Sequence, residues 1–527
     1  MSSWNAGYVT EIDYTHGFYK ALTPNLLSLY ALLRGVQAPG SDLEPRNYCE
    51  LGCGQGYTTN VLAASNPHIE FYATDFNPSH IAGARDLARA AKLGNVHFSD
   101  DSFGEYLQRD DLPDFDFITL HGIYSWISAE ARQDIVRFIA KKLKPGGIVY
   151  ISYNCMPGWA SVMPLRRLMI EHAELQGASR PLLPRVSASL DFAENLNRSE
   201  ASYFKSHPAL AARIERIRNQ SLNYVAHEYF NRDLTPFYFM DVVRELSEAK
   251  LTWVGHASTT AGLDALHLTK EQQDLLAGID DVHFRETVRD HIVNQQFRTD
   301  IFIKGAIRPG TQAVAEKWLD MRFALTSSAD IPSEIKGGRF SMKLNPDLFN
   351  GLVGALSSGP QSLREIAGLP ELKKFTRDRI IQGISHLIDQ NACHPCLPDQ
   401  GLLERRLRTD LFNKVIAERV GNGTSLHTFA SPILGGGLSQ SRINALTWLA
   451  LHNEEKDLPQ AVWSYMAPVG IRLIKDGKAL QSEEENLPEL KTHLSAIDEK
   501  TKPLWQSLGL LKPGNENVKQ QSKRLRA

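Results

Sequence analysis

Short apolar runs alternate with segments of helical periodicity between residues 48 and 152. Apolar runs of about four to eight residues indicate strands, whereas apolar residues that recur every three or four positions indicate helices. Strands that alternate with helices are typical of a parallel sheet with helices on both faces. The pattern predicts strands at 48–50, 69–74, 96–98, 115–120 and 148–152.

Three glycines at every second position follow the first strand. The strand ends at Glu50, and Gly52, Gly54 and Gly56 lead into an expected helix at 57–64. Glycines are needed where a backbone turns sharply off a strand and lets a ligand lie against it. A carboxylate just before such a loop repels a dinucleotide pyrophosphate and attracts a cation. The loop is therefore expected to bind a ligand with a cationic end.

An acidic residue also follows the second strand. Asp75 lies about twenty residues past the glycine loop, where a carboxylate can accept hydrogen bonds from both hydroxyls of a ribose. The alternative is that Asp75 caps the helix that begins near Pro78. We favour the ribose interpretation because of the position of Asp75 at a strand end.

The run Glu-x-Gly-x-Gly-x-Gly from Glu50 to Gly56 resembles motif I of class I S-adenosylmethionine-dependent methyltransferases. In that family the acidic residue helps to place the methionine end of the cofactor, which carries an ammonium and a sulfonium. An acidic or polar side chain after the third strand receives the adenine amino group. Asp101 is expected here, with its neighbours Asp100 and Ser102 as alternatives. The other alternative is that Asp101 is a solvated loop carboxylate. The resemblance implies S-adenosyl-L-methionine as cofactor, bound by Glu50, Gly52, Gly54, Gly56, Asp75, Asp101, Ser102 and His121.

The fourth and fifth strands deliver aromatic-rich segments, 121–126 and 153–159, to the carboxyl edge of the sheet. Ligands of open α/β sheets bind at that edge, so the methyl acceptor is expected there. Aromatic ring faces cradle a cationic side chain, and His121 or Asn154 can accept a hydrogen bond from an amine. The candidate catalytic residues are His121, Tyr124, Trp126, Tyr153 and Asn154.

Four further residues are candidates for substrate binding. They are Trp159 and, in the segment before the first strand, Tyr8, Tyr14 and His16. The alternative for the N-terminal residues, and for Trp126 and Trp159, is ordinary packing over the sheet edge.

Segments 121–126 and 152–159 also resemble the signature segments of a bacterial methyltransferase group that carries a methyltransferase regulatory domain. The similarity continues at 224–230, 236–239 and 289–300. Characterised members of that group are rickettsial protein lysine methyltransferases that modify outer-membrane proteins. The resemblance implies a lysine acceptor on a protein substrate, such as an outer-membrane protein.

A class I methyltransferase sheet needs two more strands after the fifth, and the sequence offers them late. Residues 160–225 are polar and helical, whereas 251–257 and 300–304 have strand character. We therefore predict a Rossmann-like, seven-stranded, mostly parallel sheet formed by 1–159 and 232–307, with a helical insertion at 160–231. A pairing surface in a homodimer is a natural use for the insertion.

The strand–helix rhythm stops near residue 308. Residues 308–410 are predicted to form a winged-helix-like module, in which acidic residues offset the basic ones, so that a protein contact is favoured over nucleic acid. A helical domain is expected at 411–511 and a disordered basic tail at 512–527. This mainly helical C-terminal half is expected to present the substrate protein.

Composition narrows the class of protein further. The 58 Lys and Arg residues nearly balance the 60 Asp and Glu residues, so no bulk charge draws the chain to nucleic acid or to an anionic membrane. No apolar run is long enough to span a bilayer, and the N-terminal segment is unlike a signal peptide, which favours a cytoplasmic protein. Cys393 and Cys396 have metal-like spacing but lack a second ligand pair, so no metal site is expected.

The resulting hypothesis is a protein lysine methyltransferase. The same residues fit a methyltransferase that acts on a small molecule or on another protein side chain. They also fit a catalytically degenerate domain that binds the cofactor and acts as a regulator. A nicotinamide dehydrogenase is disfavoured by Glu50 and by the glycine spacing.

Overall fold

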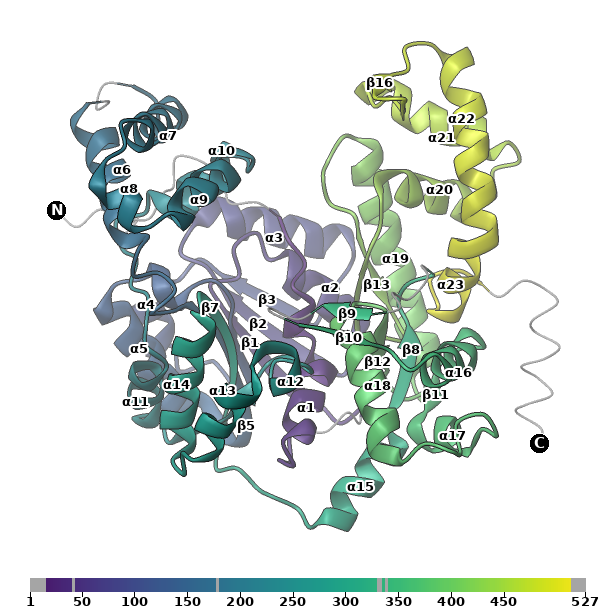
Figure 1. The fold of residues 1–527 in the computed structure, drawn as a ribbon. Helices are drawn as coiled ribbons and strands as arrows, with labels where there is room; N and C mark the ends of the chain where they lie inside the picture. Colours follow the sequence, from purple (N-terminus) through teal and green to yellow (C-terminus); the bar gives the residue numbers. More distant parts are fainter. Residues whose placement is uncertain (1–15, 40–42, 177–179, 329–333, 337–339, 513–527) are drawn as a thin grey trace.

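The computed structural model describes residues 16–39, 43–176, 180–328, 334–336 and 340–512 (Figure 1). A central seven-stranded sheet has the order β3-β2-β1-β4-β5-β7-β6. Strands β1 to β5 are parallel, and β7 is antiparallel to both of its neighbours. This confirms the predicted sheet. Its strands are β1 (Arg46–Leu51), β2 (Ile69–Thr74), β3 (Val96–Ser99), β4 (Phe115–Leu120), β5 (Leu143–Asn154), β6 (Leu251–His256) and β7 (Phe297–Lys304).

Helices cover both faces of this sheet (Figure 1). Local capping fixes where several of them begin, because the side chains of Asn77, Ser102 and Ser128 accept hydrogen bonds from backbone N–H groups of the first turn. The covering helices are α1 (Pro24–Leu33), α2 (Tyr57–Ser65), α3 (Pro78–Ala90), α4 (Phe103–Gln108), α5 (Ala129–Lys142), α11 (Phe239–Ser247) and α14 (Val282–Val293).

The chain between β5 and β6 forms the predicted helical insertion, at the upper left of Figure 1. It has an apolar core of its own, which includes Leu165, Val186, Ile214 and Val225. Its helices are α6 (Met163–Leu175), α7 (Leu182–Arg198), α8 (Ser202–Ser206), α9 (Ala209–Arg218) and α10 (Leu222–Tyr229).

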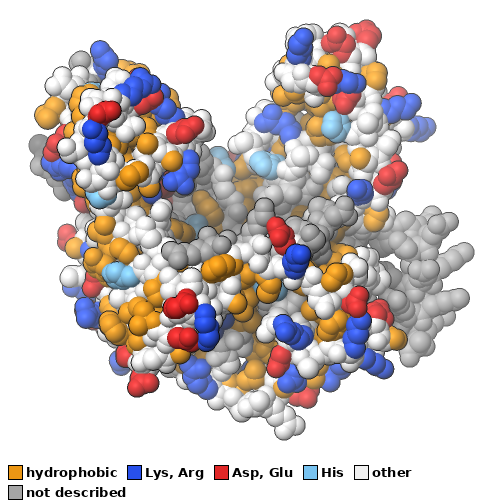
Figure 2. Space-filling view, viewed as in Figure 1, with side chains coloured by type: hydrophobic (Ala, Val, Ile, Leu, Met, Phe, Trp, Pro, Cys, Tyr) orange, Lys and Arg blue, Asp and Glu red, His pale blue; other side chains and the backbone are white. Residues whose placement is uncertain are grey.

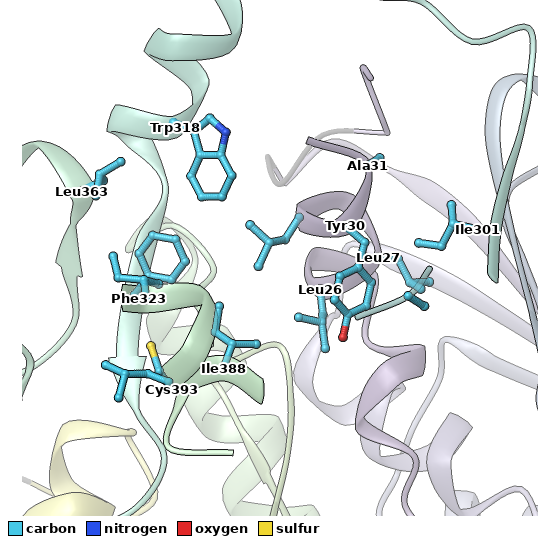
Figure 3. Packing of buried hydrophobic residues seen from close by; sticks show 14 of the residues in the cluster. Leu26, Leu27, Tyr30, Ala31, Ile301, Trp318, Phe323, Leu363, Ile388 and Cys393 are labelled. Atoms are coloured by element: carbon cyan, nitrogen blue, oxygen red, sulfur yellow. The ribbon is translucent and has the colours of Figure 1, made fainter. Parts of the chain in front are cut away.

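The region after β7 shares a core with the sheet. Leu26 and Tyr30 of α1 belong to the same apolar cluster as Trp318, Phe323 and Ile388 (Figure 3). This region is therefore packed directly against the sheet and its N-terminal helix. Its main elements are α15 (Thr311–Asp320), β8 (Arg322–Leu325), α16 (Pro346–Ser357), β11 (Gln361–Ser362), α17 (Leu363–Gly368), α18 (Arg377–Asp389) and β12 (Cys393–Pro395).

The C-terminal region is mainly helical, as predicted, but it also contains a hairpin of β13 (Thr428–Ser431) and β14 (Gly436–Ser439). The glycine run 435–437 lies at the turn of this hairpin and the start of β14. In the space-filling view the C-terminal helices and the insertion rise as two lobes on either side of a hollow (Figure 2). The helices are α19 (Leu402–Gly421), α20 (Arg442–His452), α21 (Leu458–Met466), α22 (Glu483–Ala496) and α23 (Lys502–Ser507).

The cysteine pair near the end of the middle region is buried. Burial of Cys393 and Cys396 excludes water from both thiols, and it raises the pKa of the Cys393 thiol to about 12, which leaves that thiol protonated at neutral pH.

Among the described helices, none combines the length and the apolar character that a bilayer crossing needs.

Candidate active site

A cavity of about 680 Å³ lies at the carboxyl edge of the sheet. The glycine loop after β1, the residues after β2, β3 and β4, and the end of β5 all contribute to its lining. This is the edge at which parallel α/β sheets bind ligands. The cavity lining includes these residues predicted from the sequence: Glu50, Gly52, Gly54, Asp75, Asp101, Ser102, His121, Trp126, Asn154 and Trp159.

The glycine loop has a backbone that side chains would disturb. Gly52, Gly54 and Gly56 have φ values of +73°, +52° and +62°, a region that L-residues rarely adopt. A Cβ atom on Gly52 would lie 2.4 Å from the Ile123 side chain. These glycines therefore keep a narrow turn open beside the cavity.

Glu50 is a buried carboxylate in the cavity wall. Its side chain is 4% exposed and accepts a hydrogen bond from the Thr59 hydroxyl. Burial, reinforced by the charge of Asp75, raises the pKa of Glu50 to about 7, although the Thr59 hydrogen bond opposes the rise. A cationic ligand would favour the ionised form and would offset the cost of burying it.

Asp75 faces the same cavity and holds the loop in place. One carboxylate oxygen accepts a hydrogen bond from the Gly54 backbone N–H at 2.9 Å. The other accepts one from Asn77 N–H at 3.0 Å and lies 3.2 Å from His80 Nδ1. The cap of the following helix is Asn77, not Asp75. The capping alternative for Asp75 is therefore excluded.

Asp101 and Ser102 lie across the cavity, after β3. The Asp101 carboxylate accepts a hydrogen bond from Arg109 Nη1 at 3.1 Å, which leaves further lone pairs for a donor. Ser102 caps α4 in a reciprocal capping box with Glu105. Its side chain therefore has a structural role as well as a place in the cavity lining.

His121 is held between two tyrosines at the end of β4. Its Nδ1 lies 3.0 Å from the Tyr150 hydroxyl, and its ring centroid is 4.1 Å from that of Tyr19. Burial lowers the pKa of His121 to about 4, so the imidazole is neutral at physiological pH. A neutral imidazole keeps one acceptor nitrogen and one donor N–H.

Two of the predicted catalytic tyrosines lie elsewhere. The Tyr124 hydroxyl donates to the Glu245 carboxylate, and its ring packs against Phe237. The Tyr153 hydroxyl donates to Asp300 at 2.7 Å, in a buried cluster around Arg298. We correct both expectations, because each hydroxyl is tied to a carboxylate away from the cavity.

The remaining candidates differ in placement. Tyr8 and Tyr14 lie outside the described residues. His16 is exposed, and its ring is 6.4 Å from that of Tyr57, outside the cavity lining. Gly56 lies at the start of α2, where a Cβ would meet Ala84 and Phe98. Trp126 and Trp159 line the cavity while being only 9% and 4% exposed, so they have both a packing and a lining role.

The helical insertion contributes residues that the sequence analysis did not assign to the site. Tyr224 and Glu228 are four positions apart, a spacing that places them on one face of α10. This spacing on one helix face was the signal that could have revealed them. The cavity residues from this region are Arg213, Tyr224, Glu228, Tyr229 and Asp233.

Comparisons with known proteins agree with this geometry. A family model described as "Methyltransferase domain" matches residues 49–149, and one described as "Predicted methyltransferase regulatory domain" matches residues 221–304. An uncharacterized protein of Synechocystis sp. is 40% identical over 512 residues, which cover 96% of this chain and 100% of that protein. An uncharacterized protein of Rickettsia prowazekii, RP789, is 27% identical over 55% of this chain and 51% of its own length.

A solved structure extends the likeness to the whole fold. PKMT2 from Rickettsia typhi in complex with AdoHcy has a TM-score of 0.69 at 19% identity, and the match covers 94% of this chain and 100% of PKMT2. The shared fold, the two family models and the cavity agree on cofactor and reaction type. The chain belongs to the class I S-adenosylmethionine-dependent methyltransferases that carry a methyltransferase regulatory domain.

Proposed function

We propose that this enzyme methylates lysine side chains of proteins. The observation that carries the proposal is the lining of the cavity away from the glycine loop, where Trp126, Trp159 and Tyr229 lie with the carboxylates of Glu228 and Asp233. Aromatic faces and carboxylates together suit a cationic side chain. The sequence resemblance to rickettsial lysine methyltransferases supports the same acceptor.

The residues of the cavity suggest how the cofactor is held. The ionised Glu50 carboxylate would bind the methionine ammonium, Asp75 the ribose hydroxyls, and Asp101 the adenine amino group. When bound, S-adenosylmethionine supplies an activated methyl group, so little acid–base machinery is needed. Orienting the reactants in line is worth about 7–11 kcal/mol in favourable cases.

A lysine acceptor must be neutral to react, although its ordinary pKa is about 10.4. Desolvation by the indoles of Trp126 and Trp159 disfavours the ammonium form of the lysine. The positive charge of the cofactor's sulfonium would disfavour it too. The neutral His121 imidazole and the Asn154 side chain both line the cavity and could accept a hydrogen bond from the amine. These groups would orient the nitrogen lone pair.

Asp75→Ala is expected to weaken S-adenosylmethionine binding about tenfold or more while the fold is kept. Hydrogen bonds to a charged group contribute about 1.5–3 kcal/mol, and the variant removes those to the ribose. Calorimetric titration with circular dichroism of the variant measures both quantities. Unchanged affinity would defeat the ribose assignment.

The acceptor class is testable by mass spectrometry. Candidate proteins, including outer-membrane proteins, are incubated with the enzyme and S-adenosylmethionine, and methyl increments are mapped to residues. Increments on lysine are expected. Increments only on other side chains or on small molecules would replace lysine by that acceptor, and cofactor binding without S-adenosylhomocysteine release would indicate a regulator. The homodimer through the insertion stays a prediction.

A further inference from the structure

The helical insertion supplies one end of the catalytic cavity. Tyr224 and Glu228 of α10 line the same cavity as Glu50 and Asp75 of the cofactor side. Burial, followed by the charges of Glu228, Tyr229 and Tyr19, raises the pKa of Tyr224 to about 12, and all four residues line this cavity. Tyr19 in turn contacts His121. One continuous wall therefore runs from Glu228 to the end of β4.

Glu228 is a carboxylate that lacks a donor within the described part of the chain. It is half-buried, and no described side chain or backbone group hydrogen bonds it. Burial raises its pKa to about 7, against the opposing charge of Arg213. A carboxylate held in this way favours a ligand that brings both a positive charge and hydrogen-bond donors.

Arg213, the cationic residue near Glu228, already has other partners. The Arg213 guanidinium donates to Gln296 Oε1 at 3.0 Å and to the Tyr229 hydroxyl at 3.4 Å, and it lies 4.7 Å from the Trp159 ring centroid. These contacts fix Arg213 against the aromatic wall, and among the described residues it forms no ion pair with Glu228. The carboxylate is thus left facing the cavity.

We propose that Glu228 is the ammonium-recognition residue of the acceptor subsite, and that it selects a primary alkylammonium over neutral or anionic acceptors. A flexible alkyl chain would lie against the indoles of Trp126 and Trp159, which line the cavity, with its ammonium donating to the Glu228 carboxylate. The inference rests on the proposed function because it concerns the acceptor side of the same site. It also assigns to the insertion a direct part in substrate choice.

The test uses n-butylammonium chloride as a mimic of the lysine side chain. It is titrated by calorimetry into the full-length enzyme saturated with S-adenosylhomocysteine, with n-butanol as the uncharged comparison. Wild-type enzyme is expected to prefer butylammonium, and Glu228→Gln to bind it about tenfold more weakly, because a hydrogen bond to a charged group is lost. The affinity for n-butanol and for S-adenosylhomocysteine should not change.

Glu215→Gln is the matched control, since Glu215 is an exposed carboxylate of the same insertion outside the cavity lining. It should bind butylammonium like the wild type. An affinity of Glu228→Gln within twofold of wild type would overturn the inference, and so would a wild-type enzyme that does not bind butylammonium. If butylammonium binding depends on Glu228 while no protein lysine is methylated, the proposed function fails and the ammonium subsite stands.

Discussion

Glu50→Gln is expected to weaken S-adenosylmethionine binding about 10- to 150-fold and, at the same time, to raise the melting temperature at pH 8. The affinity falls because the amide cannot replace a charged partner of the methionine ammonium, which contributes about 1.5–3 kcal/mol. The stability rises because a buried carboxylate with few compensating contacts opposes folding once it is ionised. The same substitution is thus expected to lower cofactor affinity and to raise thermal stability.

The raised pKa of Glu50 determines how the stability of the protein changes with pH. The pKa of Glu50 is about 7 in the folded protein and 4.5 in its ordinary state, so the folded protein holds a proton that the unfolded chain releases between these values. The contribution of Glu50 to stability is full below about pH 4.5 and is lost as the pH rises to 7. The advantage of Glu50→Gln in melting temperature should therefore be larger at pH 8 than at pH 5.

Thermal unfolding at both pH values and calorimetric titration of the cofactor check these expectations. Glu70→Gln serves as a control, because Glu70 is an exposed carboxylate on β2 and its only ion pair among the described residues, with His97, is exposed too and contributes little. It should change neither quantity. Equal cofactor affinity in Glu50→Gln, or a lower melting temperature at pH 8, would contradict the proposed role of Glu50.

Short-range sequence patterns predicted which residues line the cavity around the glycine loop. The glycine loop, Glu50 and Asp75 are specified by short-range constraints, namely a backbone with positive φ and carboxylates directly after strands. The acceptor side was predicted less well. Tyr153 and Asn154 are adjacent in β5, and since neighbouring strand residues point to opposite faces, only one of them reaches the cavity. Sequence alone does not say which.

The insertion and the C-terminal hairpin show a second reason why the sequence did not predict the whole site. Residues of α10 enter the cavity, and the hairpin β13–β14 packs on α2, through contacts between segments far apart in the chain. The short runs at 428–431 and 436–439 lack a periodic pattern of their own. Their strand structure depends on tertiary contacts, which override local propensity.

These contacts change the interpretation of the C-terminal half. All nine residues of α2 are buried, and the Tyr57 hydroxyl exchanges hydrogen bonds with the backbone of Thr428 at 2.8 and 3.0 Å. Ser65 and Asn66 donate to the carbonyls of Gly436 and Gly435. Because α2 begins directly after the glycine loop, the C-terminal hairpin supports the helix that positions that loop.

Gly437→Ala is therefore expected to destabilise the protein by about 1–3 kcal/mol, the usual cost of overpacking, and to weaken S-adenosylhomocysteine binding severalfold. Gly437 lies outside the cavity lining, but a Cβ there would stand 2.5 Å from Thr428 Cγ2, 2.9 Å from Val61 Cγ1 and 3.1 Å from Phe18 Cε1. Relief of these contacts must move the hairpin away from α2 or shift α2 and its loop.

The matched substitution is Gly354→Ala in α16, where an added Cβ meets nothing within 4 Å. Since alanine favours a helix over glycine by about 0.5–1 kcal/mol, Gly354→Ala should leave cofactor affinity unchanged and stabilise the protein slightly. Chemical denaturation and calorimetric titration of both variants make the comparison. If Gly437→Ala lowers the free energy of unfolding but leaves the affinity for S-adenosylhomocysteine unchanged, the hairpin supports the fold alone. A variant that loses affinity in step with stability would establish that the C-terminal half shapes the cofactor site through α2.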